Sequence, residues 1–187
     1  MAFPAKKERY TFADVLTWGE DKRIEIMNGE AFLMATPSAR HQEVCFEIGR
    51  QLGNFLEGKS CRVYPAPFGV RLFEQDGDRP EDVDTLVEPD ISVICDTNKI
   101  DDRGCNGAPD WVIEITSPSN PHIDYGIKLF KYRTAGVKEY WIVNPKKKTV
   151  TVFDFEGYEK SDQYSFDDDI SVCIYDDLVI NITDLLS

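Results

Sequence analysis

Two carboxylates occupy positions where acidic side chains are uncommon. Asp90 follows Pro89 and begins the apolar run 91–95, and Glu114 lies inside the apolar run 111–115. A carboxylate in an otherwise apolar strand is costly to bury unless a cation, a metal ion or several donors compensate its charge. If the two strands are neighbours, Asp90 and Glu114 can converge on one divalent cation, for which carboxylate-rich sites favour Mg²⁺, Mn²⁺ or Ca²⁺.

A lysine and a histidine could join this pair. Lys128 follows Asp124 by four residues in a segment of helical spacing, so it can project from a helix toward the same point. His41 lies four residues before Cys45 on the apolar face of an earlier predicted helix.

Each of these residues also has a purely structural interpretation. Asp90 can cap a turn after the proline, and Glu114 can face outward on a one-sided strand. Lys128 can form a surface pair with Asp124, which contributes only about 0.2–0.5 kcal/mol. His41 can be a hydrogen-bonded residue of the core or of the helix start.

The elements that must position these residues follow from capping signals, turn residues and apolar periodicity. In chain order the sequence predicts a short helix over 12–18, a hairpin of strands 24–27 and 31–35 around Asn28-Gly29, a long helix from Ser38 to about Glu57, a strand region over 61–73, strands 91–95 and 111–115, a helix ending at Gly136, a strand over 140–143, a hairpin of 149–155 and 158–166, a strand over 172–175, and a final turn capped by Thr183. This order is typical of a mixed α/β domain.

Composition excludes several classes of protein. With 187 residues, 42% of them hydrophobic and 12% aromatic, the chain has enough apolar material for one globular core. Its longest apolar runs fall far short of the roughly 20 residues that span a bilayer, and the first residues lack the apolar segment of a signal peptide. We therefore expect no membrane insertion and a cytoplasmic location.

The cysteines predict reduced, mostly buried thiols. They number five and contain no Cys-x-x-Cys pair, so neither a disulfide framework nor a structural zinc site is expected.

The net charge of −13 argues at face value against a nucleic-acid partner, because neutralising phosphates is the main source of such affinity. Its distribution is uneven: segments 74–102 and 154–187 each carry −9, and the remainder carries +5. Residues 103–153 hold eight bases against four acids, including Lys146, Lys147 and Lys148. The acidic segments can be solvated loops, and the lysines can be a soluble turn.

Successive blocks of the sequence resemble a widespread bacterial family of uncharacterised proteins grouped with the restriction endonucleases of the PD-(D/E)XK superfamily. The resemblance covers roughly residues 10–145, and its blocks are 23–30, 37–41, 88–93, 110–119, Asp124 with Lys128 and Tyr132, and 136–143. It implies a restriction endonuclease-like αβββαβ core with a central mixed sheet, an N-terminal hairpin and a C-terminal β extension. The expected single domain spans 1–187, with its core at about 38–145 and the extension at 146–187.

The resemblance also implies an activity and residue roles. The activity is Mg²⁺-dependent (or Mn²⁺-dependent) hydrolysis of DNA phosphodiester bonds, with a homodimer expected because two strands must be cut. Asp90, Glu114 and the backbone carbonyl of Ile115 would bind the metal. Position 116, where the motif lysine should stand, holds Thr116, so Lys128 would supply the amine. The accessory candidates are His41, Asp124, Tyr132, Glu43 and Glu47, and Lys146, Lys147 and Lys148 are candidates for DNA contact.

Two other functions fit the sequence. The departure at Thr116 and the net charge favour a catalytically inactive nuclease-fold protein that serves in binding or assembly. A metal-dependent hydrolase of a small phosphoester is the other alternative.

Overall fold

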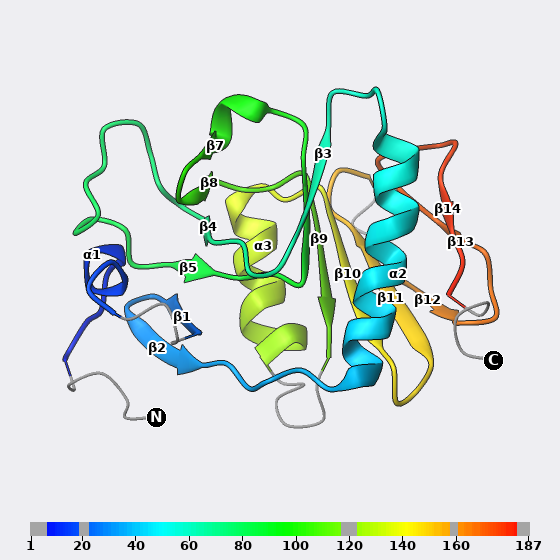
Figure 1. Ribbon diagram of the computed structural model, residues 1–187, viewed down its shortest axis with the longest axis horizontal. Helices are drawn as coiled ribbons and strands as arrows, with labels where there is room; N and C mark the ends of the chain where they lie inside the picture. Colours follow the sequence, from blue (N-terminus) through cyan, green and yellow to red (C-terminus); the bar gives the residue numbers. More distant parts are fainter. Residues whose placement is uncertain (1–6, 19–22, 117–122, 158–160, 183–187) are drawn as a thin grey trace.

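The computed structural model describes residues 7–18, 23–116, 123–157 and 161–182 (Figure 1), with only the backbone given for Ile123 and Asp124. The predicted turn at Thr183 lies outside these residues. Among the described residues, no helix is both long and apolar enough to cross a bilayer.

A six-stranded sheet, here called the central sheet, forms the middle of the molecule. Its order is β12-β11-β10-β9-β6-β3, and only the β9–β10 pair is parallel. The strands are β3 (Arg62–Pro65), β6 (Ile91–Ile94), β9 (Trp111–Ile115), β10 (Glu139–Asn144), β11 (Thr149–Asp154) and β12 (Ser161–Ser165). A parallel pair needs a crossover, and here the crossover contains the helix that carries Lys128.

A second six-stranded sheet, here called the side sheet, has the order β2-β1-β5-β4-β8-β7. Its strands are short: β1 (Ile24–Met27), β2 (Glu30–Leu33), β4 (Val70–Arg71), β5 (Leu86–Val87), β7 (Ile100–Asp101) and β8 (Gly104–Asn106). The β1–β2 hairpin turns at Asn28 and Gly29, whose φ angles of 53° and 80° need residues that tolerate the left-handed region, as the sequence predicts.

The described residues contain three α-helices and two shorter helical turns. They are α1 (Phe12–Val15), α2 (Ala39–Leu56), the 3₁₀ turn η1 (Thr97–Lys99), the π-helical turn η2 (Ile123–Lys128) and α3 (Leu129–Ala135). Ser38 caps α2 by accepting a hydrogen bond from the His41 backbone N–H, and Gly136 ends α3 at a φ of 94°. Helix α1 has the Thr11/Asp14 capping box but is shorter than predicted.

Helices α2 and α3 cover opposite faces of the central sheet (Figure 1). Trp111, Ile113 and Ile115 pack with α2 in one apolar cluster. Val112, between them, packs with Tyr132 of α3 and with the side sheet in a second cluster. Because side chains alternate along a strand, Glu114 shares the face of Val112. It therefore points toward α3 and the side sheet.

Three parts of the fold differ from the prediction. The strand region 61–73 is two strands, β3 and β4, in different sheets, and the connection predicted after residue 95 contains η1 and the β7–β8 pair. The strand predicted over 172–175 is irregular and lies between β13 (Ile170–Ser171) and β14 (Val179–Ile180). Its Cys173 and Ile174 N–H groups donate to the Glu139 carboxylate instead of to a neighbouring strand.

The expectation that all cysteines are reduced is wrong, because Cys61 and Cys95 form a disulfide. The β3–β6 register pairs Arg62 with Ile94, so the next positions, 61 and 95, face each other. This partnership spans 34 residues and leaves no local signal in the sequence. Burial raises the pKa of the Cys45 thiol to about 12 and that of Cys105 to about 11, so both are poor nucleophiles near neutral pH.

Glu139 attaches the C-terminal extension to the central sheet. Its fully buried carboxylate accepts hydrogen bonds from Trp141 Nε1 at 2.6 Å and from the Cys173 and Ile174 backbone N–H groups at 2.9 and 3.0 Å. Burial raises the pKa of Glu139 above its ordinary value of 4.5, and the backbone donors oppose that shift.

Replacing Glu139 by alanine removes the acceptor for three donors, and we expect the free energy of unfolding to fall by at least about 2 kcal/mol. Because the folded state holds the Glu139 proton to a higher pH than the unfolded state, its pKa shift adds stability at low pH that is lost as pH rises. The gap between wild type and Glu139→Ala should therefore narrow as pH rises above 4.5. Urea unfolding at several pH values measures this. The exposed Glu156→Ala is the control, and equal stability of Glu139→Ala and wild type would contradict the assignment.

Candidate active site

The strand register sets the two candidate acidic residues opposite each other. Strands β6 and β9 are antiparallel neighbours, and Ile91 pairs with Ile113. Asp90 precedes Ile91 and Glu114 follows Ile113, so the same register sets Asp90 opposite Glu114. The adjacency of the two strands, on which the sequence argument depended, is confirmed.

Asp90 is held by both neighbouring elements. Its Oδ2 accepts a hydrogen bond from the Ile115 backbone N–H at 2.7 Å. His41 Nε2, from the first turn of α2, lies 3.1 Å from the same oxygen. The His41 side chain is buried, which matches its predicted inward position on the helix. The capping bond at Ser38 thus fixes the turn that directs His41 to Asp90.

Glu114 faces the residues of η2 and α3. Its side chain is buried, and its Oε1 lies 2.9 Å from Lys128 Nζ and accepts a hydrogen bond from the Tyr132 hydroxyl at 2.6 Å. Lys128 and Tyr132 are four residues apart and therefore lie on one side of the helix. Burial, followed by the charge of Glu114, raises the pKa of Tyr132 well above its usual value, so the phenol stays protonated and donates.

Lys128 brings an amine to Glu114, whereas position 116 holds a threonine. Thr116 is buried, and its backbone N–H donates to the Val143 carbonyl at 2.8 Å, which extends the β9–β10 ladder. Lys128 ends the π-helical turn η2, just before α3 begins. Such turns frequently occur at functional sites. The helix therefore delivers the ammonium to Glu114 from across the sheet face.

Glu25 is a site residue that the sequence analysis did not single out. Its Oε1 lies 2.8 Å from Lys128 Nζ and accepts a hydrogen bond from the Glu88 backbone N–H at 2.9 Å. It lies on β1 between Ile24 and Ile26, and all three are buried. The signal was the one used for Glu114, namely a carboxylate within an apolar strand. The ammonium of Lys128 thus lies between two buried carboxylates.

Other candidates lie apart from this cluster. Glu47, expected off the apolar stripe of the helix, is buried and is bound by Arg50 and Gln51, and the hydrogen bond from Arg50 lowers its pKa. Glu43 is exposed and pairs with Arg40 at 3.6 Å. The Asp124 side chain lies outside the described part of the structure.

The oxygen donors fit a hard divalent cation that keeps part of its water shell. Asp90 and Glu114 are opposite each other, and the Ile115 carbonyl belongs to the same strand as Glu114. Within the described ranges, no cluster of three or more His, Cys, Asp or Glu side chains could enclose a metal ion. Mg²⁺ is commonly bound through one or two carboxylates with waters completing its octahedron, so this donor set suits it.

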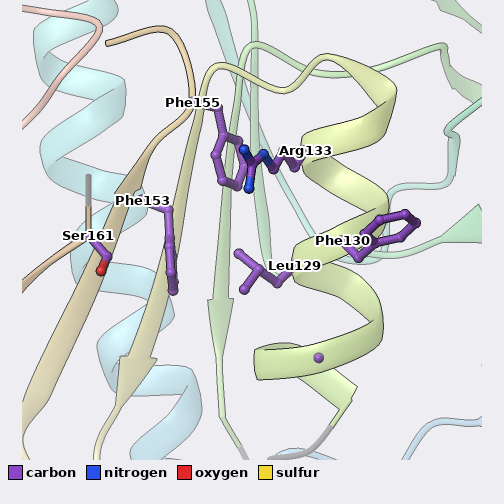
Figure 2. A pocket seen from close by; sticks show the side chains of 7 residues that line it. Leu129, Phe130, Arg133, Phe153, Phe155 and Ser161 are labelled. Atoms are coloured by element: carbon purple, nitrogen blue, oxygen red, sulfur yellow. The ribbon is translucent and has the colours of Figure 1, made fainter. Parts of the chain in front are cut away.

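A groove lies on the other flank of α3 (Figure 2). It has a volume of about 280 Å³ and is lined by Gly126, Leu129, Phe130, Arg133, Phe153, Phe155 and Ser161. Phe130 is 69% exposed, so the apolar side of this helix faces outward while Lys128 and Tyr132 face inward. None of the carboxylates described above lines the groove.

Comparison with known proteins identifies the family. The model of the Uma2 family, described as "Putative restriction endonuclease", matches residues 12–182. The chain belongs to this family. An uncharacterised protein, slr1290, of Synechocystis sp. is 23% identical over 152 residues, which cover 80% of this chain and 73% of that protein.

A solved structure supports the Uma2 fold. The crystal structure of a "putative nuclease" from Anabaena variabilis superposes with a TM-score of 0.73 at 20% identity, covering 94% of this chain and 97% of that one. The predicted family and the predicted mixed α+β, restriction endonuclease-like fold are confirmed. Family membership supports a nuclease-like function.

The Tyr132 hydroxyl gives a direct test of the buried cluster. Tyr132→Phe removes the donor to Glu114 Oε1 and nothing else, and we expect the free energy of unfolding to fall by about 1–3 kcal/mol. Tyr125→Phe, on the exposed side of the same segment, should change it by less than about 0.5 kcal/mol. Chemical denaturation of the three proteins measures both values. Equal stability of Tyr132→Phe and wild type would show that the hydrogen bond is unimportant to the fold.

Proposed function

We propose that this protein is a Mg²⁺-dependent (or Mn²⁺-dependent) endonuclease that hydrolyses DNA phosphodiester bonds. The observation that carries the proposal is the placement of Asp90 opposite Glu114 across β6 and β9, with Lys128 Nζ bound to Glu114 Oε1. Uma2 family membership supports the nuclease class.

Each side chain of the site has a separate role in this proposal. Asp90 and Glu114, with the Ile115 carbonyl, would hold the divalent cation, which would polarise the phosphate and acidify a water. Lys128 orients the attacking water or donates to a phosphate oxygen as negative charge develops there. His41 fixes the Asp90 carboxylate from the α2 side, and Tyr132 fixes Glu114 from the α3 side.

The proposed DNA contact follows from the parallel β9–β10 pair. Ile142 pairs with Glu114, so the end of β9 that carries the site lies beside the end of β10 that leads into the next turn. That turn contains the exposed residues Lys146, Lys147 and Lys148. The three lysines therefore follow the end of β10 that lies beside Glu114, where they can bind the phosphate backbone.

The proposal includes a single domain over residues 1–187, a homodimer that cuts two strands, and a cytoplasmic location. The buried bonds of Glu139 to residues 173 and 174 support the single domain, because they join the extension to the core. The Cys61–Cys95 disulfide weighs against the cytoplasm, where disulfides are rare.

Nicking of supercoiled plasmid DNA in Mg²⁺ or Mn²⁺ tests the activity. We expect wild type to nick and EDTA to stop it. Asp90→Asn and Glu114→Gln should abolish nicking, and Lys128→Met should lower the rate by roughly 100-fold or more. The exposed variants Glu57→Gln and Asp102→Asn are matched controls that should nick as wild type does. Nicking by the Asp90 and Glu114 variants at the wild-type rate, or a wild type that neither nicks nor binds Mn²⁺, would refute the proposal.

The lysine turn can be tested separately through the salt dependence of DNA binding. If Lys147 contacts a phosphate, Lys147→Ala should weaken binding equally for all sequences and reduce the slope of log K against log salt by about 1. Fluorescence anisotropy with a labelled duplex, measured in Ca²⁺ to prevent cleavage, gives this slope. Lys59→Ala, on the loop between α2 and β3, is the comparison variant. An unchanged slope for Lys147→Ala would show that Lys147 does not contact a DNA phosphate.

An inactive binding module is the second candidate. The observation that favours it is the pairing of Lys128 with two carboxylates, Glu25 and Glu114, because an engaged ammonium is less able to act on substrate. Such a protein would bind a duplex in the anisotropy experiment without nicking plasmid in either metal ion.

A further inference from the structure

The Glu25 carboxylate joins two parts of the site that are remote in sequence. A single oxygen, Oε1, lies 2.8 Å from Lys128 Nζ and 2.9 Å from the Glu88 backbone nitrogen. Glu88 stands two residues before Asp90, and its own carboxylate pairs with Arg23 at 3.2 Å. Glu25 therefore holds the lysine of the helix against the segment that carries Asp90.

The charges of the cluster are unbalanced when Lys128 is counted against Glu114 and Glu25. One carboxylate, Glu114 at 2.9 Å, already compensates the ammonium, so the second is not needed to neutralise Lys128. Glu25 is only 4% exposed, and burying a second anion is costly. An apolar residue could fill the same place between Ile24 and Ile26. The position of Glu25 therefore calls for a role beyond packing.

We propose that Glu25 is a positioning residue, which keeps Lys128 in place when Glu114 binds a divalent cation. The inference rests on the proposed function of the site. A cation bound at Glu114 would repel the Lys128 ammonium and compete with it for the Glu114 carboxylate. Glu25 supplies the lysine with a second carboxylate, so Lys128 stays beside the reacting phosphate instead of leaving the site.

Loss of the Glu25 charge has a defined effect on metal binding. In Glu25→Gln, Lys128 loses the Glu25 carboxylate and pairs more tightly with Glu114, so a cation must displace a tighter pair. Outer partners of metal sites typically change metal affinity or activity by about 10–100-fold, and we expect Mn²⁺ affinity to fall by about 10-fold. The turnover number of cleavage should fall similarly, with the KM for DNA unchanged, because Glu25 touches no substrate.

The experiment is a double-mutant cycle measured by Mn²⁺ titration calorimetry and by plasmid nicking. The proteins are wild type, Glu25→Gln, Lys128→Met and the double variant, with circular dichroism to confirm that each is folded. Glu30→Gln is the matched control, since it makes the same change at an exposed position of the same hairpin. Glu25→Asp, which keeps the charge on a shorter side chain, should recover part of the loss in Mn²⁺ affinity.

The result that supports the proposal is non-additivity: Glu25→Gln lowers Mn²⁺ affinity in the wild-type background and has no further effect once Lys128 is methionine. Wild-type Mn²⁺ affinity in Glu25→Gln, or equal effects in both backgrounds, would overturn the positioning role while leaving the endonuclease proposal intact. A wild type that neither binds Mn²⁺ nor nicks DNA would overturn both, so the two failures are distinguishable.

Discussion

Burial of the Lys128 ammonium between Glu25 and Glu114 is the constraint on which the arrangement of the site depends. Charges removed from water destabilise a fold unless their partners stand at close range in fixed geometry. Here the three charged residues come from three elements: Glu25 from β1 of the side sheet, Glu114 from β9 of the central sheet, and Lys128 from the η2–α3 crossover. The ion pairs of the site therefore form only when the two sheets and the helix dock.

One of the connections between the two sheets passes through the site itself. Strand β5 belongs to the side sheet and β6 to the central sheet, and the three residues Glu88, Pro89 and Asp90 join them. Both ends of this short link are bound, because the Glu88 N–H donates to Glu25 and the Asp90 carboxylate accepts from Ile115. Asp90 thus has little freedom before any ligand arrives, which is the preorganisation that electrostatic catalysis requires.

The sequence predicted the parts whose signals are local. The capping bond at Ser38, the Asn28-Gly29 turn, the end of α3 at Gly136 and the apolar strands around Asp90 and Glu114 each follow from a few adjacent residues. Two-residue strands such as β5 and β7 are too short for a periodic pattern and were not predicted. The Cys61–Cys95 bond and the role of Glu25 depend on partners far along the chain. The irregular backbone at Cys173 and Ile174 follows from a side-chain acceptor on another strand.

The attachment of the extension to Glu139 has a consequence for the order of folding during synthesis. During synthesis the chain emerges from the ribosome N-terminus first, so early segments are exposed before their later partners exist. The Glu139 carboxylate enters the core on β10, and two of its three donors are 34 and 35 residues further along the chain. Until the ribosome has released those residues, a carboxylate lies beside the parallel strand pair without most of its hydrogen bonds. Strand β10, which supports the site, therefore reaches its final form only after residues 173 and 174 have emerged.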